Sequence, residues 1–296
     1  MSTRLADLTP ADIATERANF PRAFSASPQE RMRFWLLWGS AAALTVYCLY
    51  RFGFLSADFL HGLTKFGAVV VAQLFPPKGF ENLPTFIKVM GETIAMAFIG
   101  TLLGAIVAFP LSFFASKNMT RSRPVQFGTR RFADLLRSFD YLIWALIFVR
   151  AIGLGPLAGI MAIAIVETGT FIKLYSEAIE NLDRKQIDGV TVAGGNGLQR
   201  IRFGVLPQVL PMMLSNTLYM FEHNVRSASI LGIVGAGGIG FLLADRLRAY
   251  ELQEACLIII LVVLTVYAID YLSQVLRYYL IGAEERTPPA DDAEPR

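Results

Sequence analysis

Long blocks without a single charged side chain constrain this chain more than any other feature. The longest, residues 93–116, holds twenty-four uncharged positions between Glu92 and Lys117, and the blocks 34–50 and 203–221 hold seventeen and nineteen. A helix needs roughly 17–25 residues to cross the hydrocarbon core of a bilayer, so each block is long enough to span. Charged residues make up only 17% of the chain, against roughly a quarter in soluble domains. The sequence therefore predicts an all-α integral membrane protein that crosses the bilayer several times.

Six spans are the simplest count that these blocks and the other apolar stretches allow. The loop 117–137 carries six lysine and arginine residues against a lone Asp134, and such basic loops are typically cytoplasmic. Alternation from that loop predicts that both termini and the loop 177–206 are cytoplasmic as well. The expected spans are roughly 33–52, 90–115, 134–152, 155–176, 207–232 and 253–276.

The segments around these spans are polar or too short to cross. The first thirty residues carry charges of both signs and three prolines, unlike the start of a secretory signal. The uncharged stretch 66–77 is too short to span and predicts a helix lying on the outer membrane surface. The predicted organisation is a cytoplasmic tail (1–32), a first span (33–52), an external segment (53–88), a main membrane domain (89–280) and a disordered cytoplasmic tail (281–296).

Cysteine, histidine and net charge argue against several other kinds of site. Cys48 and Cys256 lie in apolar stretches, where buried packing is expected rather than a disulfide. His61 and His223 have no cysteine or carboxylate cluster near them, so no metal site is predicted. A net charge of only +3 gives no reason to expect nucleic acid as a partner.

Five glycines crowd the segment 232–240. Gly235, Gly237 and Gly240 have the G-x-G-x-x-G spacing of a dinucleotide-binding turn, which needs a preceding strand. An apolar block of helical length precedes these glycines instead, and open strand edges would stay unpaired in lipid. We therefore expect structural glycines that permit a bend or close contact between backbones.

The longest predicted cytoplasmic loop contains a motif. Residues 188–211 read DGVTVAGGNGLQRIRFGVLPQVLP, and their periodicity fits two short helices broken at Gly194–Gly197. The spacing resembles the EAA loop of ABC-importer permeases, whose pattern is E-A-A-x-x-x-G-x9-I-x-L-P. The matching positions are Asp188 for the glutamate, Gly189 and Val190 for the two alanines, Gly194 for the glycine and Leu206-Pro207 for the closing pair, whereas Gly204 replaces the usual isoleucine.

A later segment narrows the resemblance to one subfamily. FEHNVRSASILGIVGAGGIG, residues 221–240, is similar to the corresponding stretch of phosphonate-type permeases, as are GVLPQVLP, VRAIGLGPLAGI and FPP at 75–77. The resemblance covers about residues 75–280 and implies the transmembrane domain of a type I ABC importer in the bacterial cytoplasmic (inner) membrane. It implies a permease homodimer with two ATP-binding cassette ATPase subunits and an external solute-binding protein. The implied cargo is phosphonate, or a closely related phosphorus oxyanion or organophosphate.

The same resemblance implies a transport subunit without a catalytic site or cofactor of its own, because ATP and magnesium belong to the ATPase subunits. The chain has no G-x-x-x-x-G-K-[ST] motif, so motion must reach it from a partner. The loop 177–206 is long for a connection, and short helices joined at a glycine can transmit a rigid-body rotation. We expect a coupling loop at about 181–206, with Asp188, Gly189, Gly194, Leu206 and Pro207 as its coupling residues.

Charged residues within the fifth predicted span are candidates for the translocation path. Glu222 and Arg226 lie four apart on one helix face and are expected to pair. One interpretation is a structural ion pair near the outer interface. The other places Arg226 and Asn224 beside the path, because a guanidinium fork suits a tetrahedral oxyanion. In that case the irregular outer gate is formed by Gly235, Gly237 and Gly238.

Two other classes of protein compete with an importer subunit. An ion-coupled secondary transporter of small anions could use intramembrane carboxylates, but it normally contains repeats, and the two halves of this chain lack convincing similarity. A membrane enzyme would need a nucleophile–base pair or a metal cluster, and the sequence offers neither. Glu167 and Lys173, six apart, are not expected to pair, and Asp270 is expected to pack or to lie near the inner interface.

Overall fold

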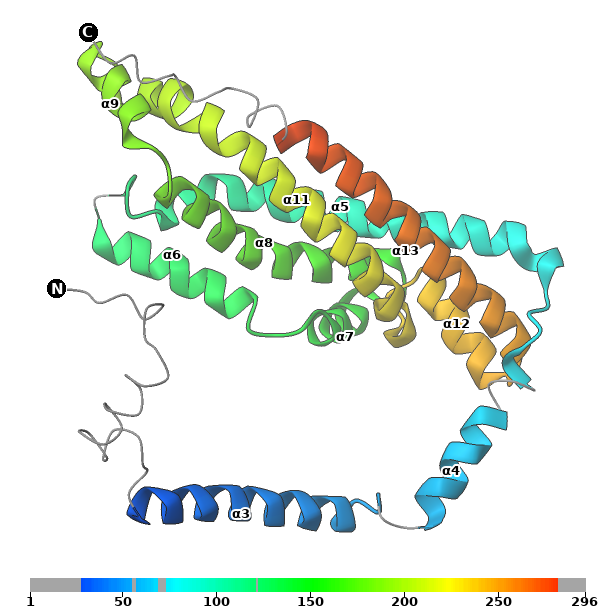
Figure 1. The fold of residues 1–296 in the computed structure, drawn as a ribbon. Helices are drawn as coiled ribbons and strands as arrows, with labels where there is room; N and C mark the ends of the chain where they lie inside the picture. The colour runs from blue at the N-terminus through cyan, green and yellow to red at the C-terminus, as the bar shows by residue number, and fades with distance from the viewer. Residues whose placement is uncertain (1–27, 55–56, 69–72, 121, 282–296) are drawn as a thin grey trace, which may run out of the picture. The chain divides into compact units, whose positions relative to one another are not determined.

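The computed structural model describes residues 28–54, 57–68, 73–120 and 122–281, and every regular element within them is a helix (Figure 1). The all-helical prediction is therefore confirmed for these residues. The chain forms two compact units, Met1–Val71 and Ala72–Arg296. Most of the two predicted tails lies outside the described residues.

The first unit contains α3 (Pro28–Arg51) and α4 (Ala57–Ala68). Arg31–Arg51 is long and apolar enough to cross a membrane, as the sequence predicted for 33–52. The helix predicted at 66–77 is wrong in position, because α4 ends at Ala68 and residues 75–79 are not helical. Consecutive prolines at 76 and 77 explain this, since neither can donate a helix hydrogen bond. Residues 69–72 lie outside the described part.

The second unit holds the remaining helices, with α9 at one end of the bundle and α12 at the other (Figure 1). In chain order they are η3 (Phe80–Asn82), α5 (Leu83–Ala115), α6 (Arg123–Leu136), α7 (Tyr141–Ile152), α8 (Pro156–Glu180), α9 (Arg184–Val192), α10 (Gly197–Gln199), the π-helical η4 (Arg200–Val205), α11 (Leu206–Leu231), η5 (Gly232–Val234), α12 (Ile239–Arg248) and α13 (Leu252–Ile281).

Helices α5 and α8 form the central pair, and α11 packs on both while α13 packs along α11. Two glycines of α5 bring the pair close together. A Cβ at Gly100 would lie 2.8 Å from Cβ of Ile163, and one at Gly104 would lie 2.7 Å from Cβ of Glu167. Small residues at a helix interface let backbones approach, which is the main route to tight packing in lipid.

Four described helices are long and apolar enough to span a bilayer, and Gly197–Val234 with Ile239–Arg248, bent by 44°, makes a fifth if counted as one. The predicted span 134–152 is wrong, because the structure divides it between α6 and α7. Asp140 caps α7 by accepting a hydrogen bond from the backbone N–H of Leu142 at 3.0 Å. With 12 residues, α7 is shorter than the roughly 17 that a span requires.

Two apolar clusters form the core of this unit. One lies toward α12 and centres on Phe86, Ile163 and Ile258, and the other lies toward α9 and centres on Phe171 and Val209. Between them along their helices lie three fully or almost fully buried polar residues, Thr101, Glu167 and Asn224. Polar side chains buried at this depth require hydrogen-bond partners from neighbouring helices.

Candidate functional site

The predicted coupling loop begins with a well-defined helix. Asp183 caps α9 by accepting from the backbone N–H of Lys185 at 3.0 Å. The helix ends in a Schellman motif, in which Gly195 N–H donates to Val190 O at 2.9 Å and Gly194 N–H donates to Thr191 O at 3.0 Å. Gly194 has a φ of 81°, so the predicted turn at this glycine is confirmed.

The second half of the loop differs from the prediction. No separate second helix forms, because α10, η4 and α11 follow one another without a break from Gly197 to Leu231. Asn196 begins this long helix with a capping box to Gln199. Gly204 is buried where η4 crosses α9, and a Cβ there would lie 3.2 Å from Cα of Ile187. The close crossing explains why glycine replaces the isoleucine of the motif.

Three large apolar side chains of the loop face outward. Val192 is 89% exposed, Leu198 77% and Phe203 59%. They lie at the end of α9, in α10 and in η4, all within the segment that joins α8 to α11. Large exposed apolar side chains on a polar loop are candidates for contact with another molecule. We refer to these three residues as the loop tip.

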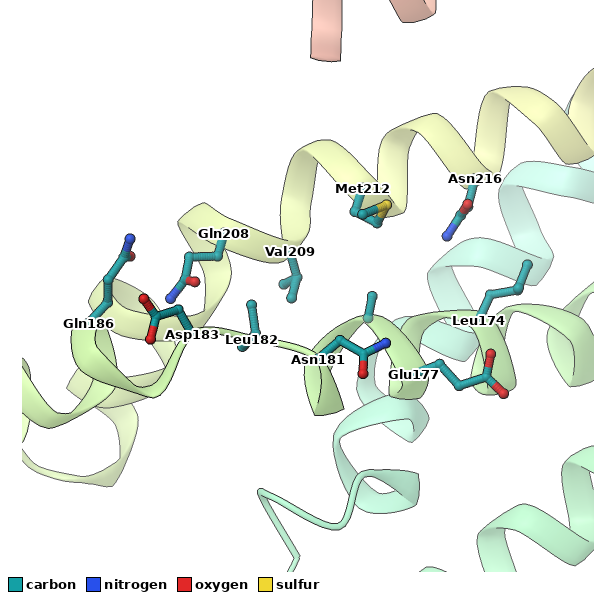
Figure 2. A pocket seen from close by; sticks show the side chains of 11 residues that line it. Leu174, Glu177, Asn181, Leu182, Asp183, Gln186, Gln208, Val209, Met212 and Asn216 are labelled. Carbon is teal, nitrogen blue, oxygen red and sulfur yellow. The ribbon is translucent and has the colours of Figure 1, made fainter. Parts of the chain in front are cut away.

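A cavity of about 440 Å³ lies beside the loop, between the end of α8 and the start of α11 (Figure 2). Its lining includes the carboxylates of Glu177 and Asp183 and contains no cation. Such a lining repels an oxyanion, so the cavity does not suit an anionic substrate. The residues that line it are Leu174, Glu177, Ala178, Asn181, Leu182, Asp183, Gln186, Gln208, Val209, Met212 and Asn216.

The buried polar residues join four helices. Tyr141 of α7 donates to Glu167 Oε1 of α8 at 2.7 Å, and Asn224 of α11 donates to Thr101 of α5 at 2.9 Å. Glu167 and Asn224 are both fully buried. Glu167 Oε2 and Asn224 Oδ1 have no hydrogen-bond partner among the described residues. The two pairs join α7 to α8 and α11 to α5, and the second places Asn224 inside the subunit rather than on an open surface.

The predicted pair between Glu222 and Arg226 is wrong. Arg277 of α13 donates to Glu222 Oε2 at 2.9 Å, and Arg226 lies 3.6 Å from Asp270 Oδ2, also on α13. Both side chains turn toward the neighbouring helix, which supplies a closer partner than the next turn of α11. Asn224 lies between them in sequence and points to α5, so the three candidate path residues occupy two faces of α11.

The glycine segment forms a tight turn at the end of α11. Gly235, Gly237 and Gly238 have φ values of 93°, 81° and 72°. The turn packs on the bundle, since Gly155 N–H donates to Gly235 O at 3.1 Å and Ile239 N–H donates to Thr93 Oγ1 at 2.8 Å. A helix precedes the turn, so the dinucleotide interpretation stays rejected and the structural interpretation is confirmed.

Several residues of these sites gave little signal in the sequence. Tyr141 and Arg277 contact carboxylates 26 and 55 positions away, so no helical spacing could indicate those contacts. For Glu167 the sequence did offer a signal, because an ionisable side chain within a predicted span usually faces the interior of the bundle. Among the described residues, no group of three His, Cys, Asp or Glu side chains could hold a metal ion.

The fold and the projecting loop define the membrane domain of a type I ABC importer. A chain from the inward-facing structure of the MetNI methionine ABC transporter superimposes with a TM-score of 0.60 over 69% of this chain and 99% of that one, at 19% identity. A chain from the bacterial alginate ABC transporter, in complex with an alginate pentasaccharide-bound periplasmic protein, gives a TM-score of 0.53 over 84% and 97%, at 17% identity.

Residues 100–282 match the family described as the binding-protein-dependent transport system inner membrane component, and this chain belongs to that family. The phosphite transport system permease protein PtxC of Stutzerimonas stutzeri is 35% identical over 219 residues, which cover 74% of this chain and 78% of PtxC. The phosphate-import permease protein PhnE of Mycolicibacterium smegmatis is 33% identical over 245 residues, covering 82% of this chain and 46% of that protein.

Proposed function

We propose that this chain is the permease subunit of an ATP-driven importer that moves phosphonate, or a closely related phosphorus oxyanion or organophosphate, across the bacterial cytoplasmic membrane. Family membership supports the importer class. The names of PtxC and PhnE, a phosphite permease and a phosphate-import permease, support a phosphorus oxyanion as cargo. The observation that carries the proposal is the coupling loop, which ends a short helix at Gly194 and exposes an apolar tip.

The proposed assembly contains two copies of this chain, two ATP-binding cassette ATPase subunits and an external solute-binding protein. ATP and magnesium bind to the ATPase subunits. The coupling loop docks on them through the loop tip and the exposed face of α9 that carries Asp188 and Gly189. Gly194 provides the turn, and Leu206-Pro207 leads into α11. Rotation of the ATPase subunits then moves the long helix that begins at Gly197 and opens the site alternately to each side.

The proposed path runs beside the outer half of α11. Arg226 is the candidate for contact with the oxyanion, because its side chain stays half exposed while it lies near Asp270. Glu222 and Arg277 form a more buried pair that holds α11 to α13. Asn224 contributes by fixing α11 to α5, and Gly235, Gly237 and Gly238 form the irregular backbone at the outer gate.

Reconstitution tests this proposal. The chain is co-expressed with an ATPase subunit and a solute-binding protein, and phosphonate uptake into lipid vesicles is measured. We expect uptake that requires ATP and the binding protein. Uptake driven by a proton gradient without ATP would instead indicate a secondary transporter.

Reporter fusions test the proposed orientation. Fusions after Arg131, after Asn181 and at the C-terminus should all report the cytoplasm, because the basic excess of 117–137 sets that side. An external signal from the fusion after Asn181 would disprove both the proposed topology and the proposed coupling role.

A further inference from the structure

A second cleft, of about 680 Å³, also borders α9 but shares no lining residue with the 440 Å³ cavity. Three segments that are distant in sequence form it: the residues that follow α5, the first turns of α9, and the start of the long helix at α10. Lys117, Arg184 and Arg200 each come from a different one of these segments. Asp188 supplies the single carboxylate among the lining residues. The cleft therefore carries a net positive charge, whereas the cavity beside α8 carries a negative one.

These cations differ from most of the basic residues that pack within the bundle. Arg130, Arg226, Arg246 and Arg277 each lie within ion-pair distance of a carboxylate. In the part of the chain that the structure describes, no ion pair involves Lys117, Arg184 or Arg200. Three cations around one hollow repel one another, so an anion within the cleft would lower the energy of the arrangement.

We propose that this cleft binds a phosphoryl group, that of inorganic phosphate or of an anionic phospholipid headgroup. Two guanidinium groups can each donate in a bidentate manner to a tetrahedral oxyanion, and an ammonium adds a third positive charge. Asn118, another lining residue, donates through Nδ2 to the backbone carbonyls of Ile179 and Glu180, at 3.3 and 3.0 Å, and so holds the segment after α5 to the end of α8. A bound phosphoryl group bridges α9 to the segment after α5, and so fixes α9 against the bundle.

The lining of this cleft favours a small anion over a partner protein. The loop tip residues do not line the cleft, and Asp188 is the one lining residue that also belongs to the proposed docking face of α9. Three cations from three segments line one cleft, which suits an oxyanion because it can accept hydrogen bonds from more than one of them. The inference rests on the proposed function only for assigning this face to the cytoplasm, because the binding chemistry needs no ATPase subunit.

The first experiment measures binding of inorganic phosphate to the purified full chain in phosphatidylcholine nanodiscs by titration calorimetry. We expect saturable binding that sulfate inhibits and that chloride at equal ionic strength does not. Arg184→Gln and Arg200→Gln should each weaken binding about tenfold, the effect of one charge-assisted hydrogen bond. Lys185→Gln is the matched control, since it removes one charge from the next position of α9 and does not line the cleft.

The second experiment uses nanodiscs that contain phosphatidylglycerol. If the headgroup is the source of the phosphoryl group, native mass spectrometry should show phosphatidylglycerol retained by the chain and lost in the Arg184→Gln/Arg200→Gln double variant. Binding of either probe supports the proposal. Absence of both, or an equal loss in Lys185→Gln, overturns it, because the cations would then act only as a general positive field.

A separate measurement keeps this test apart from the proposed function. Association with the ATPase subunit is followed without phosphate and in phosphatidylcholine. If Arg200→Gln abolishes that association while the unsubstituted chain binds neither probe, the cations dock the ATPase and the phosphoryl site is disproved. The importer assignment would still stand in that case.

Discussion

The two glycine-rich turns of this chain lie at opposite ends of the bundle and use glycine for different reasons. At the turn after α9, a Cβ added to Gly194 would find nothing within 4 Å, whereas one on Gly195 would lie 2.7 Å from Cγ1 of Val190 at the end of the same helix. At the other end, a Cβ on Gly240 would lie 1.9 Å from the carbonyl oxygen of Ser229, and one on Gly232 would lie 2.5 Å from the backbone nitrogen of Phe241. Gly232 and Gly240 permit close packing against other backbone of the subunit, whereas Gly194 supplies a left-handed backbone with open space around it. The space around Gly194 therefore distinguishes it from Gly232 and Gly240, where backbone packing excludes any side chain.

The largest effect is expected from Gly240→Ala. The new methyl group would overlap a backbone carbonyl that cannot move without unwinding α11, so we expect a cost at or above about 3 kcal/mol, the upper end of ordinary overpacking. Thermal unfolding followed by fluorescence-detected size exclusion measures the loss. Gly91→Ala is the matched control, because its Cβ would meet nothing within 4 Å and alanine favours a helix. Equal behaviour of the two variants would break the comparison.

The next effect is expected from Gly194→Glu at the open turn. Left-handed backbone costs an ordinary residue about 1–2 kcal/mol, so insertion and folding should survive. Transport and substrate-stimulated ATP hydrolysis should fall, because a bulky side chain at the turn blocks docking on the ATPase subunit. Gly194→Ala carries the same backbone strain with little bulk and should retain most activity. If Gly194→Glu retains both activities, the loop is only a connector.

A smaller effect is expected when the loop tip is made polar. The variant Val192→Ser/Leu198→Ser should fold normally, because both side chains are largely exposed. Its association with the ATPase subunit should weaken at least about tenfold, since each buried apolar side chain is worth about 1.5–3 kcal/mol. Tyr250→Asn, at the exposed turn between α12 and α13, provides the control from the other end. A loss of association in that variant would contradict the assignment of the two ends.

The smallest effect is expected from Arg226→Ala. This variant tests whether the end of the bundle near the glycine turn also contacts the substrate. Phosphonate uptake should fall several-fold with the protein level unchanged, because the path loses a positive charge. Asp270→Asn removes the other half of the ion pair and should leave uptake closer to normal. Similar losses of protein level in both variants would indicate a purely structural pair.

The sequence predicted those features that depend on neighbouring residues. Uncharged blocks indicated the long helices α3, α5 and α11, and the spacing of glycines indicated the turn at Gly194. The helix α6 was missed because its many polar residues read as a basic loop, although its amphipathic face packs against α8. Within that helix, Arg130 pairs with Glu180 at 2.5 Å, fifty positions away.

The polar contacts between helices could not be predicted from the sequence, because they join residues that are far apart along the chain. Helical periodicity reports which side chains share a face, but it does not report which helix that face meets. Glu222 and Arg226 do share a face of α11, as predicted, and both therefore reach α13 together. Their partners Arg277 and Asp270 are fixed by tertiary packing, which no local spacing encodes.

The unbroken helix from Gly197 to Leu231 has a mechanical consequence. At 1.5 Å per residue it is about 50 Å long, enough to reach from the coupling loop to the glycine turn at the far end. It can act as a lever whose two ends move in opposite directions about the crossing with α5. A tilt of about 5° would displace one end by about 4 Å relative to the other, from the same rise per residue. The π-helical segment η4, next to the loop, adds a point where this helix can bend. The stiffness of the helix therefore determines how much of a displacement at the loop is transmitted to the glycine turn.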